Sequence, residues 1–73
     1  MFEYPLKFKN EIIPDYFMNI NSEILSMKSN KILVPFPNKE NKLVVWVKIN
    51  GKDKMIRLDY LVIFTLKPYY DDI

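Results

Sequence analysis

The sequence predicts a small α+β protein in which an antiparallel sheet, containing a β-hairpin at Asn50-Gly51, packs on one short C-terminal helix. Two features predict this fold. The Asn-Gly pair lies between two segments of alternating apolar and polar residues, and a nearly all-apolar segment, 60–66, ends just before Pro68. A chain of 73 residues can bury only one hydrophobic core, so we expect a single domain spanning residues 1–73.

The hairpin is predicted from its turn outward. Asn-Gly readily adopts the positive φ angles of a type I′ turn, whose twist matches that of the flanking strands. A two-residue loop pairs Leu43 with Leu58, Val45 with Ile56, Trp46 with Met55 and Lys48 with Asp53. A four-residue loop would slide the pairing by two and leave each side chain on the same face. The face expected to pack on the core carries Leu43, Val45, Val47, Ile49, Ile56 and Leu58, with Lys52 and Lys54 near the tip. The opposite face carries Val44, Trp46, Lys48, Asp53, Met55 and Arg57.

The C-terminal helix is predicted over residues 60–66. Asp59 is a suitable N-cap, and Pro68 disfavours a helical conformation at Lys67. Such an apolar helix must bury one side, and the residues expected to face the hairpin are Leu58, Leu61, Val62 and Thr65 or Leu66.

Shorter strands are predicted before the hairpin. Residues 16–20 and 24–27 read as two strands around a turn at Asn21-Ser22, and 32–34 as a third that Pro35 and Pro37 cut short. Residues 1–15 are expected to form an N-terminal arm or an edge strand, which could pair with a partner chain. Residues 16–66 then form the module of sheet and helix, and residues 67–73 an acidic, aromatic tail with Asp71 and Asp72.

The composition argues against catalysis. Without His or Cys the chain lacks the usual general base, the usual thiol nucleophile and the commonest zinc ligands, so we expect no enzyme, no metal, no cofactor and no small-molecule substrate. No apolar run approaches the roughly 20 residues that span a bilayer, and the N-terminus lacks the pattern of a signal peptide. We therefore expect a protein in the cytoplasm of the host cell, alone, as an oligomer, or as a subunit of a virion or complex, without membrane contact.

Positive charge is concentrated in the middle of the chain. Residues 28–57 contain eight basic and two acidic residues, a net charge of +6, whereas each flanking segment carries −2. Such a segment can attract polyanions. The candidates for phosphate contacts are Lys28, Lys31, Lys48, Lys52, Lys54 and Arg57. A Lys-rich solvated surface without such a role is the alternative.

Trp46 has two interpretations. The N-terminal strands could cover it, which we expect because so small a protein needs its largest side chain for the core. If it is exposed, Trp46 with Met55 and Arg57 could instead form a base-stacking platform or the centre of a protein interface.

The order of these signals resembles a known module. Tyr16 with Asn19, then residues 23–29 and 31–33, the hairpin, and Leu61-Val62 followed by Phe64 are similar to the small β-rich motif beside the nuclease domain of phage HNH homing endonucleases. The chain departs from that motif at Ser22, where the family has glycine, and at Asp59-Tyr60, where it has histidine-arginine. The sequence contains no nuclease half. Because the motif contacts DNA in that family, the resemblance implies a DNA-binding ancestry for the sheet.

Two functions follow as hypotheses. The first is a small phage-type accessory protein that binds nucleic acid through the basic hairpin. The alternative is a protein-interaction module, such as an inhibitor, a regulator or a virion component, that binds a host or viral protein through Trp46, Met55 and Arg57.

Overall fold

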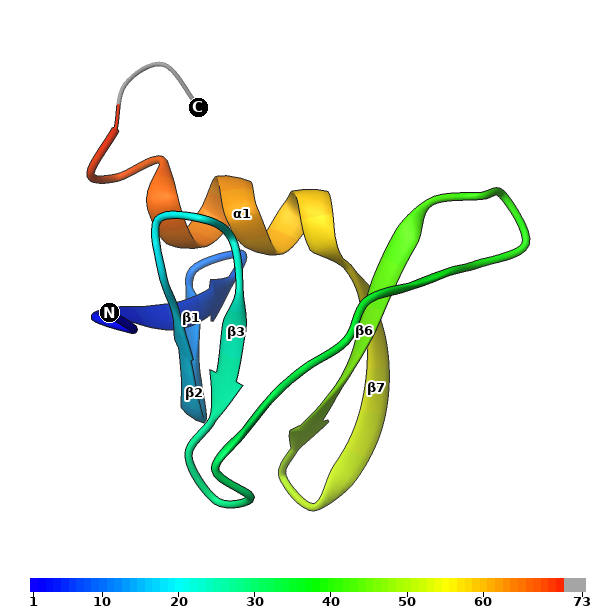
Figure 1. Ribbon diagram of the computed structural model, residues 1–73, viewed down its shortest axis with the longest axis horizontal. Helices are drawn as coiled ribbons and strands as arrows, with labels where there is room; N and C mark the ends of the chain where they lie inside the picture. Colours follow the sequence, from blue (N-terminus) through cyan, green and yellow to red (C-terminus); the bar gives the residue numbers. More distant parts are fainter. Residues whose placement is uncertain (71–73) are drawn as a thin grey trace.

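The computed structural model describes residues 1–70 and confirms the α+β class. The strands are β1 (Tyr4–Phe8), β2 (Glu11–Met18), β3 (Ile24–Ser26), β4 (Lys31–Ile32), β5 (Phe36–Pro37), β6 (Leu43–Ile49) and β7 (Lys52–Arg57), and the helix is α1 (Leu58–Leu66). They form two antiparallel sheets, in the orders β1-β2-β3-β4 and β5-β6-β7 (Figure 1). The chain crosses between the sheets at Pro35, which has no N–H with which to continue a ladder.

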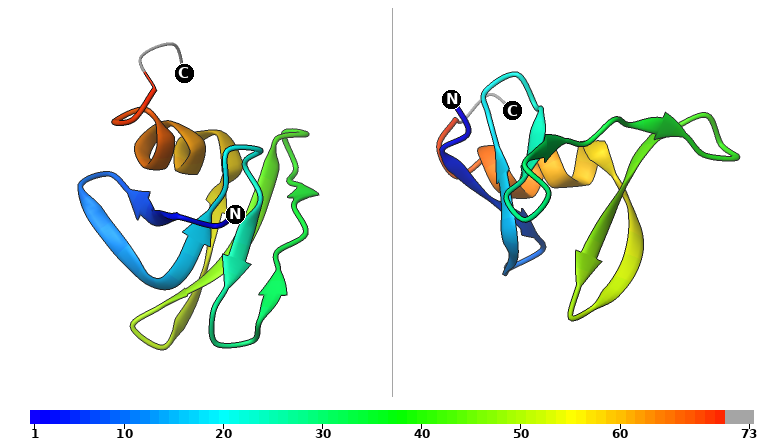
Figure 2. Two further views of the ribbon diagram at one scale, coloured as in Figure 1. Left: turned by 60° about the vertical axis from the view of Figure 1, so that its left-hand side comes forward. Right: turned by 60° about the horizontal axis from the view of Figure 1, so that its bottom comes forward.

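The core lies between the sheets and the helix. Its buried members are Leu6, Ile13, Met18, Ile24, Val45, Val47, Ile56, Leu61 and Leu66. The predicted inward face of the hairpin is confirmed at Val45, Val47 and Ile56, and the predicted inward face of the helix at Leu61 and Leu66. Helix α1 contacts β1 of one sheet and both strands of the β6–β7 hairpin, and so joins the two sheets (Figure 2).

Strand β1 lies at the edge of its sheet, as predicted, but α1 covers part of its outer side. The Thr65 hydroxyl accepts a hydrogen bond from the Lys7 N–H at 2.9 Å and donates one to the Lys7 carbonyl at 3.3 Å. Nearby, the hydroxyl groups of Tyr4 and Tyr70 are hydrogen-bonded to each other. A partner strand could therefore not pair with β1 at Lys7 without displacing Thr65.

Strand β2 begins at Glu11, whereas the strand was predicted to begin at residue 16. A large bulge separates the unpredicted first part of β2 from the rest. Pro5 pairs with Phe17 and Lys7 with Ile12, so between these pairs β1 has one residue and β2 has four. Asp15, within the bulge, has φ +70°, a conformation that aspartate tolerates better than most residues. The bulge breaks the alternation from which a strand is recognised. Farther along, the predicted strand 32–34 is shorter than expected and lies at Lys31–Ile32.

The predicted helix end at Leu66 is confirmed, but its predicted start and the expected non-helical conformation of Lys67 are wrong. The helix starts at Leu58 with Arg57 at the N-cap, and Asp59 lies within the first turn. Lys67 keeps helical angles, φ −56° and ψ −36°, and donates its N–H to the Ile63 carbonyl despite the following proline. Turn hydrogen bonds from residues 69 and 70 to the Leu66 carbonyl hold this end in place and outweigh the local steric preference.

At the start of β6, Leu43 and Val44 lie in environments opposite to those predicted. Leu43, expected in the core, is 51% exposed, because the β6–β7 pairing ends at Val44 and Arg57 before the chain turns into the helix. Val44, expected on the outer side, is buried because β5 places Phe36 beside it and β7 places Arg57 on its other side. Strand β5 was not predicted from the sequence.

Within residues 1–70, no helix is long and apolar enough to cross a membrane. The predicted acidic tail includes Asp71 and Asp72, which lie outside the described residues.

Candidate nucleic-acid interface

The tip of the β6–β7 hairpin forms one side of the candidate site. Asn50 and Gly51 have φ +53° and +78°, as a type I′ turn requires, and Ile49 pairs directly with Lys52. The predicted turn is thus confirmed, as are the pairs of Val45 with Ile56, Trp46 with Met55 and Lys48 with Asp53. The predicted pair of Leu43 with Leu58 does not form, because Leu58 begins the helix. The turn leaves Lys52 and Lys54 exposed near the tip.

The turn between β3 and β4, residues 27–30, forms the other side. The Met27 N–H donates to the Asp15 carbonyl at 2.8 Å, so the bulge of β2 supports this turn. Lys28 lies on the turn with its ammonium 3.7 Å from Asp15. Lys31 begins β4 opposite Ser26, and both lysines are exposed.

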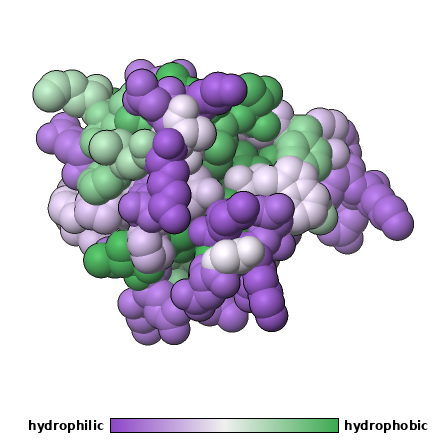
Figure 3. All heavy atoms as spheres, turned by 90° about the horizontal axis from the view of Figure 1, so that it is seen from below, coloured by the Kyte–Doolittle hydropathy of each residue, from purple (hydrophilic) through white to green (hydrophobic). Residues whose placement is uncertain are grey.

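An open cleft of about 520 Å³ separates these two turns. Its lining includes Tyr16, Ser26, Lys28 and Ser29 on one side and Trp46, Lys48, Asn50, Gly51 and Asp53 on the other. The Tyr16 phenol accepts a hydrogen bond from the Lys48 N–H at 2.8 Å and so joins the two walls. Figure 3 views the molecule from this end, where hydrophilic residues gather next to more hydrophobic surface.

Five of the six predicted phosphate-binding residues lie on the two hairpins, β3–β4 and β6–β7, whose turns flank the cleft. We call this region the basic end; its members are Lys28, Lys31, Lys48, Lys52 and Lys54. Asp15 lies 3.7 Å from Lys28 and Asp53 lies 4.0 Å from Lys48. Five lysines and these two carboxylates leave a net charge of +3. Both ion pairs are solvent-exposed, and such pairs contribute little and exchange readily.

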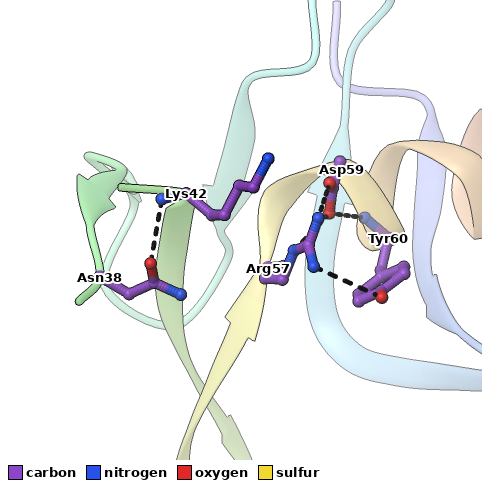
Figure 4. A network of polar contacts seen from close by, with 5 residues as sticks. All are labelled: Asn38, Lys42, Arg57, Asp59 and Tyr60. Atoms are coloured by element: carbon purple, nitrogen blue, oxygen red, sulfur yellow. Dashed lines mark hydrogen bonds and ion pairs between the residues drawn. The ribbon is translucent and has the colours of Figure 1, made fainter. Parts of the chain in front are cut away.

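Arg57, the sixth predicted residue, lies at the far end of β7 and already has a partner. Its guanidinium donates two hydrogen bonds to the Asp59 carboxylate, at 3.2 and 2.5 Å, and lies 4.6 Å from the centre of the Tyr60 ring (Figure 4). The hydrogen bond from Arg57 lowers the pKa of the Asp59 carboxyl below its ordinary value, and the same bond raises the pKa of Arg57. The structure therefore places Arg57 apart from the five lysines, so the six predicted residues do not lie on one surface.

The outer face of the β5–β6–β7 sheet carries exposed aromatic and apolar side chains. Trp46 is 52% exposed and Met55 50%, so the prediction that Trp46 is buried is wrong. The N-terminal strands, which were expected to cover Trp46, form their own sheet, and β1 packs on α1 instead. Phe36 stacks beside Trp46, with ring centres 6.3 Å apart. We define the outer face as Phe36, Trp46 and Met55.

Tyr16, Ser26 and Ser29 line the cleft without having been predicted as site residues. Tyr16 entered only through the family resemblance, and its distance of 32 residues from Lys48 gives no local signal of their contact. The positive φ of Asp15 and Asn30 marks the turns that bring this wall together, and Pro14 and Ser29-Asn30 are weak turn signals in the sequence.

The fold and the site define a small α+β protein with a cleft at its basic end and an aromatic outer face. Comparison of the chain with protein-family models, curated proteins and solved structures finds no match.

Proposed function

We propose that this protein binds nucleic acid through the basic end. The observation that carries the proposal is the approach of two turns: Lys28 and Lys48 line one cleft from opposite walls, and Lys31, Lys52 and Lys54 lie on the same two hairpins outside the cleft lining. With Asp15 and Asp53, these five lysines leave a local charge of +3. Lysine ammonium groups on neighbouring turns are suited to contact successive phosphates of a backbone. The resemblance to the DNA-contacting motif of HNH homing endonucleases adds support from the sequence.

The salt dependence of binding tests this function. If three or four of the five lysines contact phosphates, the log–log slope of affinity against salt is about −3 to −4, since each neutralised phosphate contributes roughly −0.9. Fluorescence anisotropy of a labelled duplex measures this slope. No duplex binding at low salt would contradict the proposal for duplex DNA, and the same titration with a single strand extends the test to nucleic acid in general.

A pair of double variants locates the contact. Lys52→Glu with Lys54→Glu should weaken binding to every sequence similarly and reduce the salt slope by about 2, because phosphate contacts carry no base information. Lys39→Glu with Lys42→Glu is the matched control: it changes the net charge equally at exposed positions before β6, away from the hairpin tip. Equal losses from both double variants would mean that only net charge matters, and would contradict a defined basic end.

A second candidate function is protein binding through the outer face. It is favoured by the half-exposed Trp46 and Met55 beside Phe36, because Trp and Met are enriched in interface centres. Partner capture from the native host, performed with and without nuclease, tests it. Trp46→Ala should weaken a direct protein contact by about 2 kcal/mol or more, and Met55→Ala should also weaken it, whereas the reversal at Lys52 and Lys54 mainly slows association. Capture that disappears with nuclease would contradict this candidate.

A further inference from the structure

The cleft contains an aromatic side chain as well as lysines. Trp46 lines the same cavity as Lys28 and Lys48, and more than half of its surface remains exposed although Phe36 stacks beside it. A volume of about 520 Å³ is within the range of small-ligand sites, roughly 300–1,000 Å³. The cleft can therefore accept a flat ring against Trp46 and an anion near the lysines.

Paired bases cannot use this arrangement. In a duplex the faces of the bases are covered by their neighbours, so an aromatic side chain in a cleft reaches only an unpaired base. We propose that the cleft holds one unpaired nucleotide of a nucleic-acid strand, with its base stacked on Trp46 and its phosphate between Lys28 and Lys48. This inference rests on the proposed nucleic-acid binding and specifies which form of nucleic acid the basic end prefers.

The polar groups of the cleft fit such a ligand. The ammonium groups of Lys28 and Lys48 come from opposite walls and lie 3.7 and 4.0 Å from Asp15 and Asp53, which line the same cleft. Both ion pairs are exposed and weak, so each lysine can turn from its carboxylate to a phosphate, while the two aspartates remain beside it. The hydroxyls of Ser26 and Ser29 line the wall opposite Trp46 and can donate or accept hydrogen bonds from a sugar or a base edge. Hydroxyls and carboxylates can pair with the edges of several bases, so the cleft should bind different base sequences with similar affinity, as expected when stacking dominates binding.

Trp46 is the only tryptophan in the chain, so its fluorescence reports directly on stacking. Titration with oligothymidylate of about 12 nucleotides, and with oligouridylate of the same length, should quench the emission, whereas a blunt duplex of that length should bind without comparable quenching. The DNA and RNA strands share the stacking chemistry and are distinguished by their relative affinities.

Variants separate stacking from other roles of Trp46. By anisotropy with a labelled oligothymidylate, Trp46→Ala should weaken binding at least about fivefold, while Trp46→Tyr retains most of it and duplex affinity changes little. Met55→Ala, next to Trp46 on the outer face but outside the cleft lining, should leave single-strand affinity unchanged. Circular dichroism of each variant establishes that it is folded, and the wild-type quenching experiment does not depend on any variant.

The outcomes distinguish this inference from the function on which it rests. Quenching by single strands, a preference for them over duplex and a loss in Trp46→Ala alone support the unpaired-nucleotide site. Salt-dependent binding to duplex and single strand with equal affinity and no quenching overturns the inference and leaves the basic end as a phosphate-binding surface. Absence of binding to either form overturns both.

Discussion

The phenol of Tyr16 on β2 accepts a hydrogen bond from the backbone N–H of Lys48 on β6, at 2.8 Å, and so bridges the two sheets across the cleft. Tyr16→Phe removes only this acceptor. A typical hydrogen bond contributes about 0.5–1.5 kcal/mol to stability, so we expect a loss of about 1 kcal/mol. Hydrogen exchange should show the Lys48 amide losing more protection than the core amide of Ile56, whose protection falls only by the loss of about 1 kcal/mol in global stability. Equal protection of Lys48 in both proteins would mean that the bridge does not form.

The turn at Gly51 depends on backbone conformation alone. A Cβ built at Gly51 meets nothing within 4 Å, so a substitution is strained only by its φ of +78°. Gly51→Ala should therefore cost about 1 kcal/mol, and β-branched Gly51→Val more, each kcal/mol lowering the melting temperature by about 4–8 °C. The control Asn50→Gly, at the other positive-φ position, should change stability little. A melting temperature unchanged by Gly51→Val would contradict the turn assignment.

The buried Thr65 hydroxyl is the hydrogen-bond partner of the Lys7 N–H and carbonyl at the edge of β1. Thr65→Val keeps the shape but leaves the Lys7 N–H and carbonyl without their partner, and the expected cost is about 1–3 kcal/mol in the free energy of unfolding. Thr65→Ser keeps the hydroxyl and should lose less. Chemical denaturation of the three proteins measures the difference. If Val is tolerated better than Ser, packing rather than hydrogen bonding determines this position.

The Arg57–Asp59 pair predicts a dependence of stability on pH. Because the pKa of folded Asp59 lies below its unfolded value of about 3.9, the stabilisation by the ionised carboxylate is complete above that pH and is lost as the pH falls through the folded pKa. In Arg57→Gln the pKa of Asp59 should rise toward its ordinary value. Carboxyl NMR titration of both proteins measures it, with Lys48→Gln as a control distant from the pair. An identical Asp59 pKa in wild type and Arg57→Gln would show that the pair does not persist in solution.

The sequence alone determined the hairpin, its turn and its register. These depend on two adjacent residues that adopt positive φ and on strict alternation in the strands, so local chemistry specifies them. It also determined the presence of the C-terminal helix and the burial of Val45, Val47 and Ile56. The basic segment was likewise visible, because charge is a property of composition.

Only the tertiary structure decided which of these charged and aromatic residues share a surface. Division of the strands into two sheets leaves Trp46 exposed and opens the cleft, and the bulge at Asp15 supplies the wall that carries Lys28. Arg57 pairs with Asp59 away from the basic end, because the helix begins at Leu58 and places the Asp59 carboxylate within hydrogen-bond distance of the guanidinium. The sheet division and the bulge depend on contacts between segments far apart in the chain, and the helix start depends on a choice between positions of similar local preference. Long-range contacts and near-equal helix starts leave no periodic signal in the sequence.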